Sequence, residues 1–382
     1  MRTTSPVWVE IDAGAIAHNL DVVRGAVGIT TRLCGVVKAD AYGHGIPVVL
    51  PILTAAGVDT IGITSNQEAE EVRRLGFPGR IIRLRAALRD EIQEGGRLDI
   101  EEWVGGGDHA RVVVAAARSL GRPLRVHLSL NSTGLSRDGM DWDDPQAQPH
   151  LRRIAASPEL AIVGVCSHFP CEDADDVRAG ALAFRNQAGA AERVLGAPRG
   201  RFEKHCATSY AALTVPDSRM DMVRIGAALY GDTSAAIPDL LPAMRLVSRI
   251  AAINPYPAGN TVGYDRAARI DRSSRLAVIP VGYADGYPRT LGGRAHVLVH
   301  GTFAPVIDRL AMNSLVIDVT QVPSAQVGDE VVLYGRQGSA QIRSADIERA
   351  SGTIAAGSYT AWARLNPRVV VDVPASESVP TG

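Results

Sequence analysis

The sequence predicts an α/β fold, a (β/α)8 TIM barrel, followed by a C-terminal all-β domain. From Val7 to about Gly231, short apolar runs alternate with amphipathic helical stretches, which is the pattern of parallel βα units. The length of this region fits an eight-fold barrel better than an open sheet. A doubly wound sheet is the alternative, but no Gly-x-Gly-x-x-Gly motif follows an early strand. After Pro242, short β-rich runs separated by turn residues predict a compact β domain.

The predicted elements follow this division. In the first part, examples of the strand-like runs are residues 33–37, 60–64, 80–84, 126–130, 161–165 and 222–225, with helical patterns such as 66–75 and 150–156 between them. In the second part they are residues 246–253, 276–280, 296–300, 315–319, 330–334 and 368–373, interrupted by one helical segment at 344–351. We therefore expect a barrel over residues 1–243, a β domain over 244–373 and a disordered tail over 374–382, with the first strand (6–12) as a candidate member of the β domain.

The composition excludes several classes of protein. The 382 residues carry 40 Lys and Arg against 41 Asp and Glu, a formal net charge of −1, so nothing favours nucleic acid or an anionic membrane as a partner. No apolar run reaches the length of about 18 residues that predicts a transmembrane helix. The first residues lack the apolar segment of a signal peptide, so a cytoplasmic location is expected unless a leader has been trimmed. Four cysteines are too few for a disulfide scaffold, and Cys166 and Cys171 lack a second ligand pair at zinc spacing, so no metal is expected.

The most informative stretch is residues 37–45, Val-Lys-Ala-Asp-Ala-Tyr-Gly-His-Gly. It places Lys38 at the C-terminal end of an apolar strand, where the active sites of such barrels are built. A half-buried ammonium group has a lowered pKa, which suits it to form a Schiff base and to act as a base. The alternative is a lysine that merely extends from the rim into solvent. A glycine-rich loop bearing Tyr42 and His44 is poor packing material, which favours a functional site.

Residues 37–45 resemble the pyridoxal phosphate lysine motif of the alanine racemase family. The resemblance extends from about Val7 to Val373, and several separate motifs recur in the same order. It implies a barrel that carries pyridoxal 5'-phosphate on Lys38, a β domain, and a homodimer with two shared active sites. The implied substrates are small-molecule amino acids.

Further motifs resemble the parts of the family's site that hold the cofactor. Residues 223–231 resemble a late barrel strand in which Arg224 faces the pyridine nitrogen and the backbone near Gly226 reaches the phosphate. A guanidinium is always protonated, so it can only donate, and an unprotonated ring nitrogen suits an enzyme that only moves an α-proton. Residues 205–210 resemble the segment whose serine, Ser209, binds the phosphate, although taken alone Ser209 is more simply a helix cap. The resemblance also assigns Tyr42 and Tyr359 to the phosphate, Arg137 to the phenolic oxygen, and His168 (otherwise an ordinary buried histidine) to the side of the ring.

Racemisation also needs a second base, because one lysine cannot readily serve both faces of the α-carbon. Residues 260–265 resemble the segment with the family's catalytic tyrosine, so the resemblance makes the partner subunit's Tyr264 the base opposite Lys38. The pKa of a tyrosine, ordinarily about 10, must be lowered by the site for this role near neutral pH. By the same resemblance Tyr283 lines the substrate entrance, and the backbone of Met312 meets the substrate carboxylate. Without the resemblance, both tyrosines would be taken for ordinary sheet packing beside an Asp285-Gly286 hairpin turn.

The sequence differs from typical alanine racemases at two places in these motifs. Met312-Asn313-Ser314 stands where those enzymes have Met-Asp-Gln, and Ser129 stands where they often have a carbamylated lysine. Loss of the carbamate leaves Arg137 without its usual anion, and we hypothesise that chloride or Asp138 replaces it. The same departures resemble the broad-specificity amino acid racemases. Thr133 and Asp138 differ from the usual pattern of that group, which suggests a shift of substrate choice toward basic side chains.

The sequence therefore predicts a homodimeric, pyridoxal phosphate-dependent amino acid racemase with a two-base mechanism and broad specificity. One alternative is an alanine racemase proper that supplies D-alanine. A second is a decarboxylase or aldolase on a related barrel, which would not need a base at Tyr264. A third, a single-domain cofactor carrier without catalysis, is opposed by the complete β domain.

Overall fold

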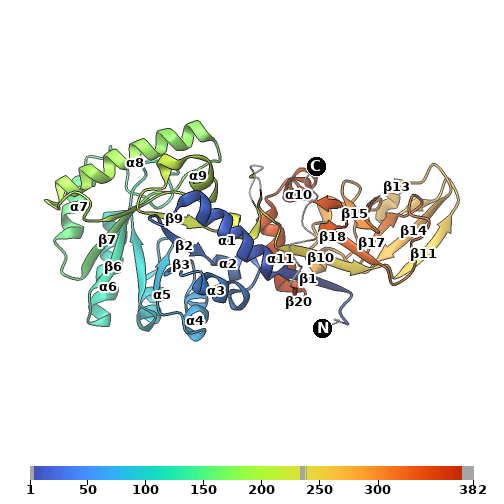
Figure 1. The fold of residues 1–382 in the computed structure, drawn as a ribbon, viewed down its shortest axis with the longest axis horizontal. Helices are drawn as coiled ribbons and strands as arrows, with labels where there is room; N and C mark the ends of the chain where they lie inside the picture. The colour runs from blue at the N-terminus through green and yellow to red at the C-terminus, as the bar shows by residue number, and fades with distance from the viewer. Residues whose placement is uncertain (1–3, 233–236, 238, 372–382) are drawn as a thin grey trace.

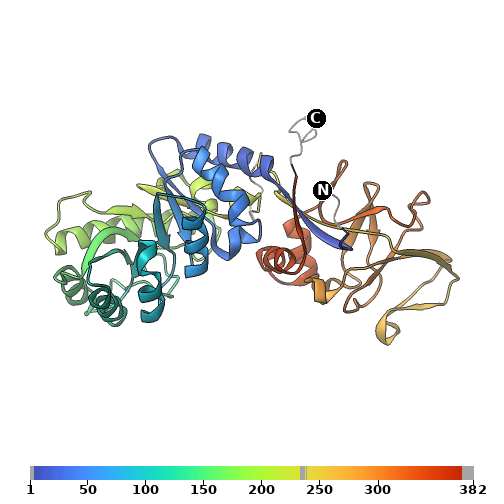
Figure 2. The ribbon, with the colours of Figure 1, turned by 90° about the horizontal axis from the view of Figure 1, so that it is seen from below.

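The computed structural model describes residues 4–232, 237 and 239–371, which form two bodies in an elongated molecule (Figure 1). The barrel forms one end and the β domain the other, and helix α11 (Ala355–Leu365) lies between them (Figure 2). Most of the buried apolar side chains form one continuous cluster, which extends from Val37 and Ile61 in the barrel to Leu246 in the β domain. The predicted tail at residues 374–382 lies outside the described residues.

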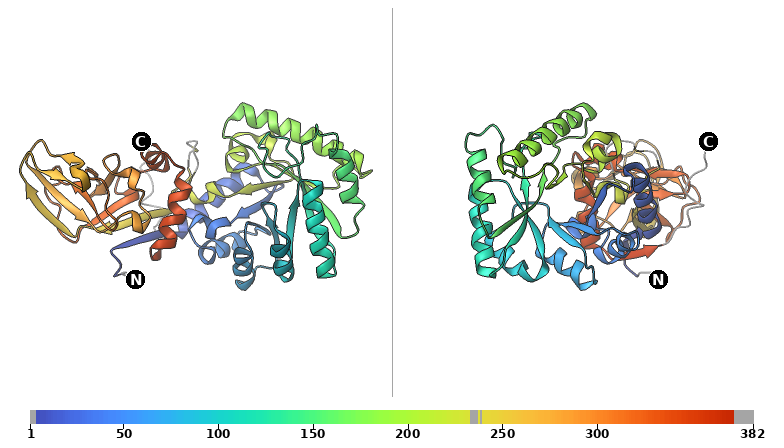
Figure 3. Two further views of the ribbon diagram at one scale, coloured as in Figure 1. Left: turned by 180° about the vertical axis from the view of Figure 1, so that it is seen from behind. Right: turned by 60° about the vertical axis from the view of Figure 1, so that its left-hand side comes forward.

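The barrel consists of eight parallel strands in the order β8-β7-β6-β5-β4-β3-β2-β9. Backbone hydrogen bonds join its two edges, from Asp221 N–H to Lys204 O (3.0 Å) and from Arg224 N–H to Ala207 O (3.0 Å), so the ring is nearly closed. Helices cover the outside of the strands (Figure 3, right), and the predicted barrel is confirmed. The strands are β2 (Arg32–Val36), β3 (Thr60–Ile63), β4 (Arg80–Arg83), β5 (Ile100–Val104), β6 (Leu124–Ser129), β7 (Leu160–Cys166), β8 (Glu203–His205) and β9 (Met222–Ile225).

Capping side chains set where several barrel helices begin. Asp12 Oδ1 accepts the N–H of Ala15 (2.9 Å) at the start of the first helix. Ser65 and Glu68 form a capping box at the start of the fourth. The helices are α1 (Ala13–Val27), α2 (Lys38–Tyr42), α3 (Ile46–Ala55), α4 (Asn66–Arg74), α5 (Arg89–Glu94), α6 (Gly107–Leu120), α7 (Ala147–Ala155), α8 (Ala174–Val194) and α9 (Ser209–Thr214).

The predicted runs omit two barrel strands, β5 and β8. Their sequences, Ile-Glu-Glu-Trp-Val and Glu-Lys-His, are not apolar runs. Glu101, Glu102 and His205 are nevertheless buried. A buried charge needs a partner, and Arg80 pairs with Glu101 (2.9 Å) while Arg83 pairs with Glu102 (3.0 Å). Buried ion pairs inside the barrel therefore replace the apolar side chains that normally identify a strand.

The second domain is mostly β and includes the first strand of the chain. Its largest sheet has the order β16-β15-β18-β10-β1-β20, with β19 paired to β18. Strand β1 (Val7–Asp12) pairs antiparallel with β10 and parallel with β20, so that Val9 lies opposite both Leu246 and Arg368. Two smaller sheets, β11-β14-β17 and β12-β13, complete the domain. The strands are β10 (Met244–Arg249), β11 (Ala252–Tyr256), β12 (Thr261–Val262), β13 (Ala268–Arg269), β14 (Ser274–Ile279), β15 (His296–Val299), β16 (Thr302–Pro305), β17 (Leu315–Asp318), β18 (Glu330–Gln337), β19 (Ala340–Ile342) and β20 (Arg368–Val371).

The domain that was predicted to be all β also contains two helices. Helix α10 (Ser344–Ser351) coincides with the predicted segment, whereas α11 was not predicted because it contains Gly, Ser and Thr, which are weaker helix formers. Burial of Tyr359, Trp362 and Ala363 on one face stabilises α11. Among the helices of the described ranges, none combines the length and the apolar character that crossing a membrane requires. The cytoplasmic location stays a prediction.

Candidate active site

Lys38 stands just beyond strand β2, at the C-terminal end of the barrel. Val37 still donates its N–H to Gly62 O of β3 (2.9 Å), but Ala39 to Tyr42 have a left-handed backbone with φ between 52° and 55°. Each non-glycine residue in a left-handed helical turn costs roughly 1–2 kcal/mol. The turn is therefore strained and must be held by its surroundings, as is typical of functional sites.

Side chains from three elements hold this turn. Glu68 of α4 accepts the N–H of Ala39 with Oε1 (2.7 Å). Asp40 accepts the N–H of Ile46 with Oδ1 (2.8 Å), and its Oδ2 pairs with Arg368 of β20. Glu68 was not among the predicted site residues, although the capping box to which it belongs is visible in the sequence.

Lys38 and Lys204 are the only lysines in the sequence. Lys204 lies in strand β8, and its Nζ bonds to Glu192 Oε1 (2.9 Å), so it is held by an ion pair. Lys38 is therefore the one lysine of the candidate site.

Three of the predicted residues, Arg137, Arg224 and His168, lie close to Lys38. Burial lowers the pKa of Lys38, and the neighbouring Arg137 and Arg224 lower it further, while Glu68 opposes them. Burial and the same group of cations lower the pKa of His168 to about 3, so its imidazole is neutral at physiological pH. The excess of positive charge at this end of the barrel favours an anionic ligand.

The guanidinium of Arg224 is buried and nearly saturated with acceptors. Nη1 donates to His205 Nδ1 (2.8 Å) and His205 O (2.9 Å), and Nη2 donates to Ser167 O (2.8 Å), His168 Nδ1 (3.1 Å) and Cys206 O (3.2 Å). Within the part of the chain that the structure describes, only its Nε–H lacks a hydrogen bond. Arg224 is thus fixed in place with one donor free for a ligand.

Ser209, Gly226 and Tyr42, here called the hydroxyl cradle, meet at one point. Ser209 Oγ accepts the N–H of Gly226 (3.2 Å) and that of Ala228 (3.1 Å). A Cβ on Gly226 would lie 2.8 Å from the Tyr42 hydroxyl oxygen, so only glycine lets this tyrosine approach. Thr208 caps helix α9, which makes the capping interpretation of Ser209 wrong. Hydroxyl and backbone N–H groups gathered in this way are the donors that phosphate oxygens need.

The hydroxyl of Tyr359 belongs to a separate cluster of hydroxyls, which lies in the β domain. Its hydroxyl bonds to the hydroxyls of Tyr334 (2.7 Å) and Ser344. No hydrogen bond in the described ranges joins it to the hydroxyl cradle. Its backbone still lies against the loop that follows Lys38, because a Cβ on Gly43 would be 2.7 Å from Tyr359 O. Helix α11 therefore supports the lysine loop directly.

Arg137 has a carboxylate beside it. Asp138 Oδ1 is 3.6 Å from Arg137 Nε, so the structure provides one of the two hypothesised replacements for the missing carbamate. Thr133 also contacts the site, because its Oγ1 donates to His168 O (2.5 Å). Both positions that depart from the broad-specificity pattern therefore contact residues of the predicted site.

Tyr264, Tyr283 and Met312 lie on the β domain and are exposed in the single chain, with exposed fractions of 64%, 42% and 55%. Tyr283 donates its N–H to Ala311 O (3.3 Å), which places it beside Met312. Such exposure argues against sheet packing as the role of either tyrosine. Tyr264 lies in the loop between β12 and β13, and β13 lies toward the end of the molecule away from the barrel (Figure 1), so within one chain Tyr264 does not reach Lys38.

These features define a two-domain barrel protein with a cationic site built around a single lysine. Residues 11–234 match the family model for the N-terminal domain of alanine racemase, and residues 243–370 match the model for its C-terminal domain. The chain therefore belongs to the alanine racemase family, whose members in general use pyridoxal phosphate. The resemblance noted in the sequence is confirmed.

Relatives cover both domains. A broad specificity amino-acid racemase of Pseudomonas putida is 42% identical over 368 residues, which is 96% of this chain and 90% of the relative. A lysine racemase of Proteus mirabilis is 40% identical over 365 residues, 96% of this chain and 89% of the relative. The crystal structure of the alanine racemase from D-cycloserine-producing Streptomyces lavendulae superposes with a TM-score of 0.87 at 32% identity, covering 99% of this chain and 100% of the other.

Proposed function

We propose that this protein is a pyridoxal phosphate-dependent racemase that interconverts the L- and D-forms of several amino acids. The observation that carries the proposal is the position of Lys38, whose pKa burial and two arginines lower, at the mouth of a barrel of this family. Relatives named broad-specificity amino-acid racemases match nearly the whole chain, which supports the same reaction class.

The residues present fit pyridoxal 5'-phosphate. The hydroxyl cradle would hold the phosphate, and a Cβ at Gly226 would fill the space it offers. The free Nε–H of Arg224 suits the pyridine nitrogen, with His168 beside the ring and Arg137 at the phenolic oxygen. Tyr359 would act through the contact of its helix with the lysine loop, since its hydroxyl is engaged elsewhere. When bound, the cofactor supplies the electron-withdrawing ring that makes the α-proton of an attached amino acid acidic.

The chain's own residues then decide what happens to the α-proton. Lys38 would hold the cofactor covalently and, once the substrate amine has replaced it, take or give a proton on one face of the α-carbon. The lowered pKa increases the fraction of neutral amine available as a base. Arg224 can only donate a hydrogen bond, so it brings no proton to the ring nitrogen and favours simple proton transfer over competing reactions.

The second base would come from a second copy of the chain. Tyr264 is exposed and remote from Lys38 in its own chain, and Tyr283 and Met312 are exposed in the same domain. We therefore propose a homodimer in which the β domain of each chain covers the barrel mouth of the other. In this arrangement Tyr264 of the partner subunit serves the face opposite Lys38, Tyr283 of the partner subunit lines the entrance, and Met312 of the partner subunit meets the substrate carboxylate.

Asp138 influences which amino acids the site accepts as substrates. Its carboxylate, 3.6 Å from Arg137, places a negative charge next to the site. A cationic side chain on the substrate would be attracted to that charge, which favours lysine and arginine as substrates. The 40% identity to a lysine racemase supports this direction.

The test is incubation of the cofactor-loaded protein with single L-amino acids in D₂O, followed by chiral chromatography and mass spectrometry. The panel is alanine, serine, methionine, glutamine, lysine and arginine. Turnover of several large side chains is expected, whereas turnover of alanine alone would favour an alanine racemase proper. Loss of CO₂ without inversion would favour a decarboxylase.

Asp138→Asn tests substrate choice separately from reaction class. We expect its kcat/KM for lysine to fall about 10-fold relative to that for methionine. If the ratio of the two kcat/KM values is unchanged, Asp138 does not determine substrate choice. The proposal that the protein is a racemase would be unaffected.

A further inference from the structure

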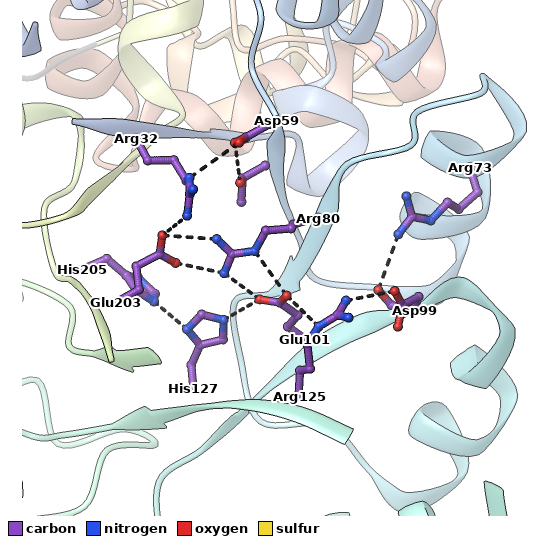
Figure 4. A network of polar contacts seen from close by, with 11 residues as sticks. Arg32, Asp59, Arg73, Arg80, Asp99, Glu101, Arg125, His127, Glu203 and His205 are labelled. Carbon is purple, nitrogen blue, oxygen red and sulfur yellow. Dashed lines mark hydrogen bonds and ion pairs between the residues drawn. The ribbon is translucent and has the colours of Figure 1, made fainter. Parts of the chain in front are cut away.

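A row of three hydrogen bonds leads from Arg224 to a carboxylate at the opposite end of the barrel. His205 Nδ1 is 2.8 Å from Arg224 Nη1, and its Nε2 is 2.9 Å from His127 Nδ1. His127 Nε2 is in turn 2.8 Å from Glu101 Oε2. All four side chains are buried, and Figure 4 shows the part of the row from His205 to Glu101.

The chemistry of the groups fixes the direction of every bond in this row. A guanidinium has only donors, so His205 Nδ1 must be unprotonated to accept from Arg224. Burial and the positive charge of Arg224 hold the pKa of His205 well below its ordinary value, so the ring carries one proton, on Nε2. His205 Nε2–H then donates to His127 Nδ1, and His127 Nε2–H donates to Glu101.

Glu101 is held as a carboxylate at the far end. Burial alone would raise its pKa, but hydrogen bonds from His127 and Arg80 lower the pKa to about 2. Arg80 donates to Oε1 (3.2 Å) and Oε2 (2.9 Å), and Arg125 donates to Oε1 (2.9 Å) (Figure 4). A carboxylate can only accept, so Glu101 imposes at its end of the row the same direction that Arg224 imposes at the other.

The barrel is locally adapted to admit this row. The pairing of β6 with β7 shifts register between Val126 and His127, so that His127 lies opposite Gly164. A Cβ on Gly164 would lie 2.2 Å from His127 Nδ1, within the space that the ring occupies. The bulge and the glycine together give His127 room to meet His205.

We propose that Glu101 and His127 are positioning residues that fix the tautomer of His205 and thereby hold Arg224 in its donating orientation. If His205 were protonated on Nδ1, its N–H would point at an N–H of Arg224 Nη1. Two donors would then face each other, and Arg224 would lose this hydrogen bond. The carboxylate of Glu101 forbids that arrangement from the other end of the barrel. The inference rests on the proposed function, because Arg224 matters to the chemistry only if it faces the cofactor.

The first test measures the tautomers directly in the wild-type, cofactor-loaded protein. Histidine labelled with ¹⁵N in the ring distinguishes protonated from unprotonated nitrogens by chemical shift, and His127→Gln assigns the signals of that residue. We expect unprotonated Nδ1 and protonated Nε2 in both His127 and His205. A protonated Nδ1 on His205 would overturn the inference, whatever the activity of the protein.

The second test compares two carboxylates on the same arginine. Glu101 and Glu203 both pair with Arg80, but among the described residues the side chain of His127 has hydrogen bonds to Glu101 and His205 and none to Glu203. Glu101→Gln presents either an oxygen or an N–H₂ group to His127, so it should give mixed ring-nitrogen signals and lower kcat about 10–100-fold at little change in KM. Glu203→Gln should leave the histidine spectrum as in wild type and kcat within about twofold.

Equal losses in the two variants would mean that these carboxylates only stabilise the barrel, and would overturn the inference. An unchanged histidine spectrum in Glu101→Gln would overturn it as well. If Glu101→Gln does not fold, the wild-type tautomers still decide the matter. A wild-type protein with the stated tautomers but without α-deuterium exchange on any amino acid would instead overturn the proposed function, and with it the role given to Arg224.

Discussion

The carboxylate of Glu68 bonds to the backbone N–H of Ala39 at 2.7 Å, and thereby ties helix α4 to the residue after the site lysine. Its other oxygen accepts the N–H groups of Thr64 (2.7 Å) and Ser65 (3.1 Å) at the start of the same helix. One side chain therefore both begins a helix and holds a left-handed turn.

Replacing Glu68 should loosen the lysine loop. In Glu68→Ala three backbone N–H groups lose their acceptor, so we expect the free energy of unfolding to fall by about 1–3 kcal/mol. Retention of the cofactor on dialysis should weaken in parallel. Glu70→Gln is the matched control, since Glu70 pairs with Arg97 on the exposed face of the same helix and should change stability by less than about 0.5 kcal/mol. Equal effects in urea unfolding would show that Glu68 has no special role.

Lys38→Ala should abolish both covalent attachment of the cofactor and racemisation. Because the chain has only two lysines, borohydride reduction followed by peptide mass spectrometry has only two lysine side chains to distinguish. We expect the label on Lys38 in wild type and in Lys204→Ala, and none in Lys38→Ala. A label on Lys204 would contradict the assignment.

Tyr264→Phe should leave the covalent attachment intact and lower turnover about 10²–10⁴-fold, the usual contribution of a general acid–base group. The loss should differ between the L and D substrates, because only one face of the α-carbon loses its base. Tyr256→Phe, another exposed tyrosine of the β domain, should behave as wild type. Equal and normal exchange of both enantiomers in Tyr264→Phe would rule out the two-base mechanism.

Acid should destabilise the protein below pH 6.5 through its buried neutral histidines. Burial lowers the pKa of His44 to about 4 and that of His168 to about 3, against an ordinary value of 6.5. Between these values and 6.5 the unfolded chain binds protons that the folded chain does not, so stability falls as the pH falls. At pH 5 each of the two should cost about 2 kcal/mol, from 1.36 kcal/mol per pKa unit.

The free energy of unfolding in urea at pH 7 and pH 5 checks this. His44→Gln should remove about 2 kcal/mol of the difference between the two pH values. The exposed His18 provides the control, since His18→Gln should keep the full difference. If His44→Gln retained it too, another group would have to cause the acid sensitivity.

Much of the barrel could be predicted because most of its strands are apolar runs, as in Met222–Ile225. Strands β5 and β8 were not predicted because they carry Glu101, Glu203 and His205. The partners of these side chains come from other strands, so the local sequence gives no sign that they are buried. The left-handed turn after Lys38 could not be read from the sequence either, since it contains no glycine and is held by Glu68 and Arg368 from far along the chain.

The candidate site, too, could be predicted only in part from the pattern of residues. The end-of-strand position of Lys38 follows from periodicity alone, whereas Arg224, Ser209 and Tyr264 were found only through the resemblance to a family. In the structure Ser209, at the start of helix α9, bonds to Gly226, just after strand β9, and no spacing in the sequence encodes this contact.

The pairing of β1 with β20 has a consequence for how this protein is made. Strand β1 leaves the ribosome long before β20, which it needs as a partner on one side, with Val9 opposite Arg368. The barrel can begin to assemble during translation while this leading strand still has an open edge. Formation of a sheet between strands so far apart in the sequence is slow, so nascent molecules would expose an aggregation-prone strand until β20 has been synthesised and has paired with it. Production of the protein should therefore depend on chaperones more strongly than the stability of the finished molecule would suggest.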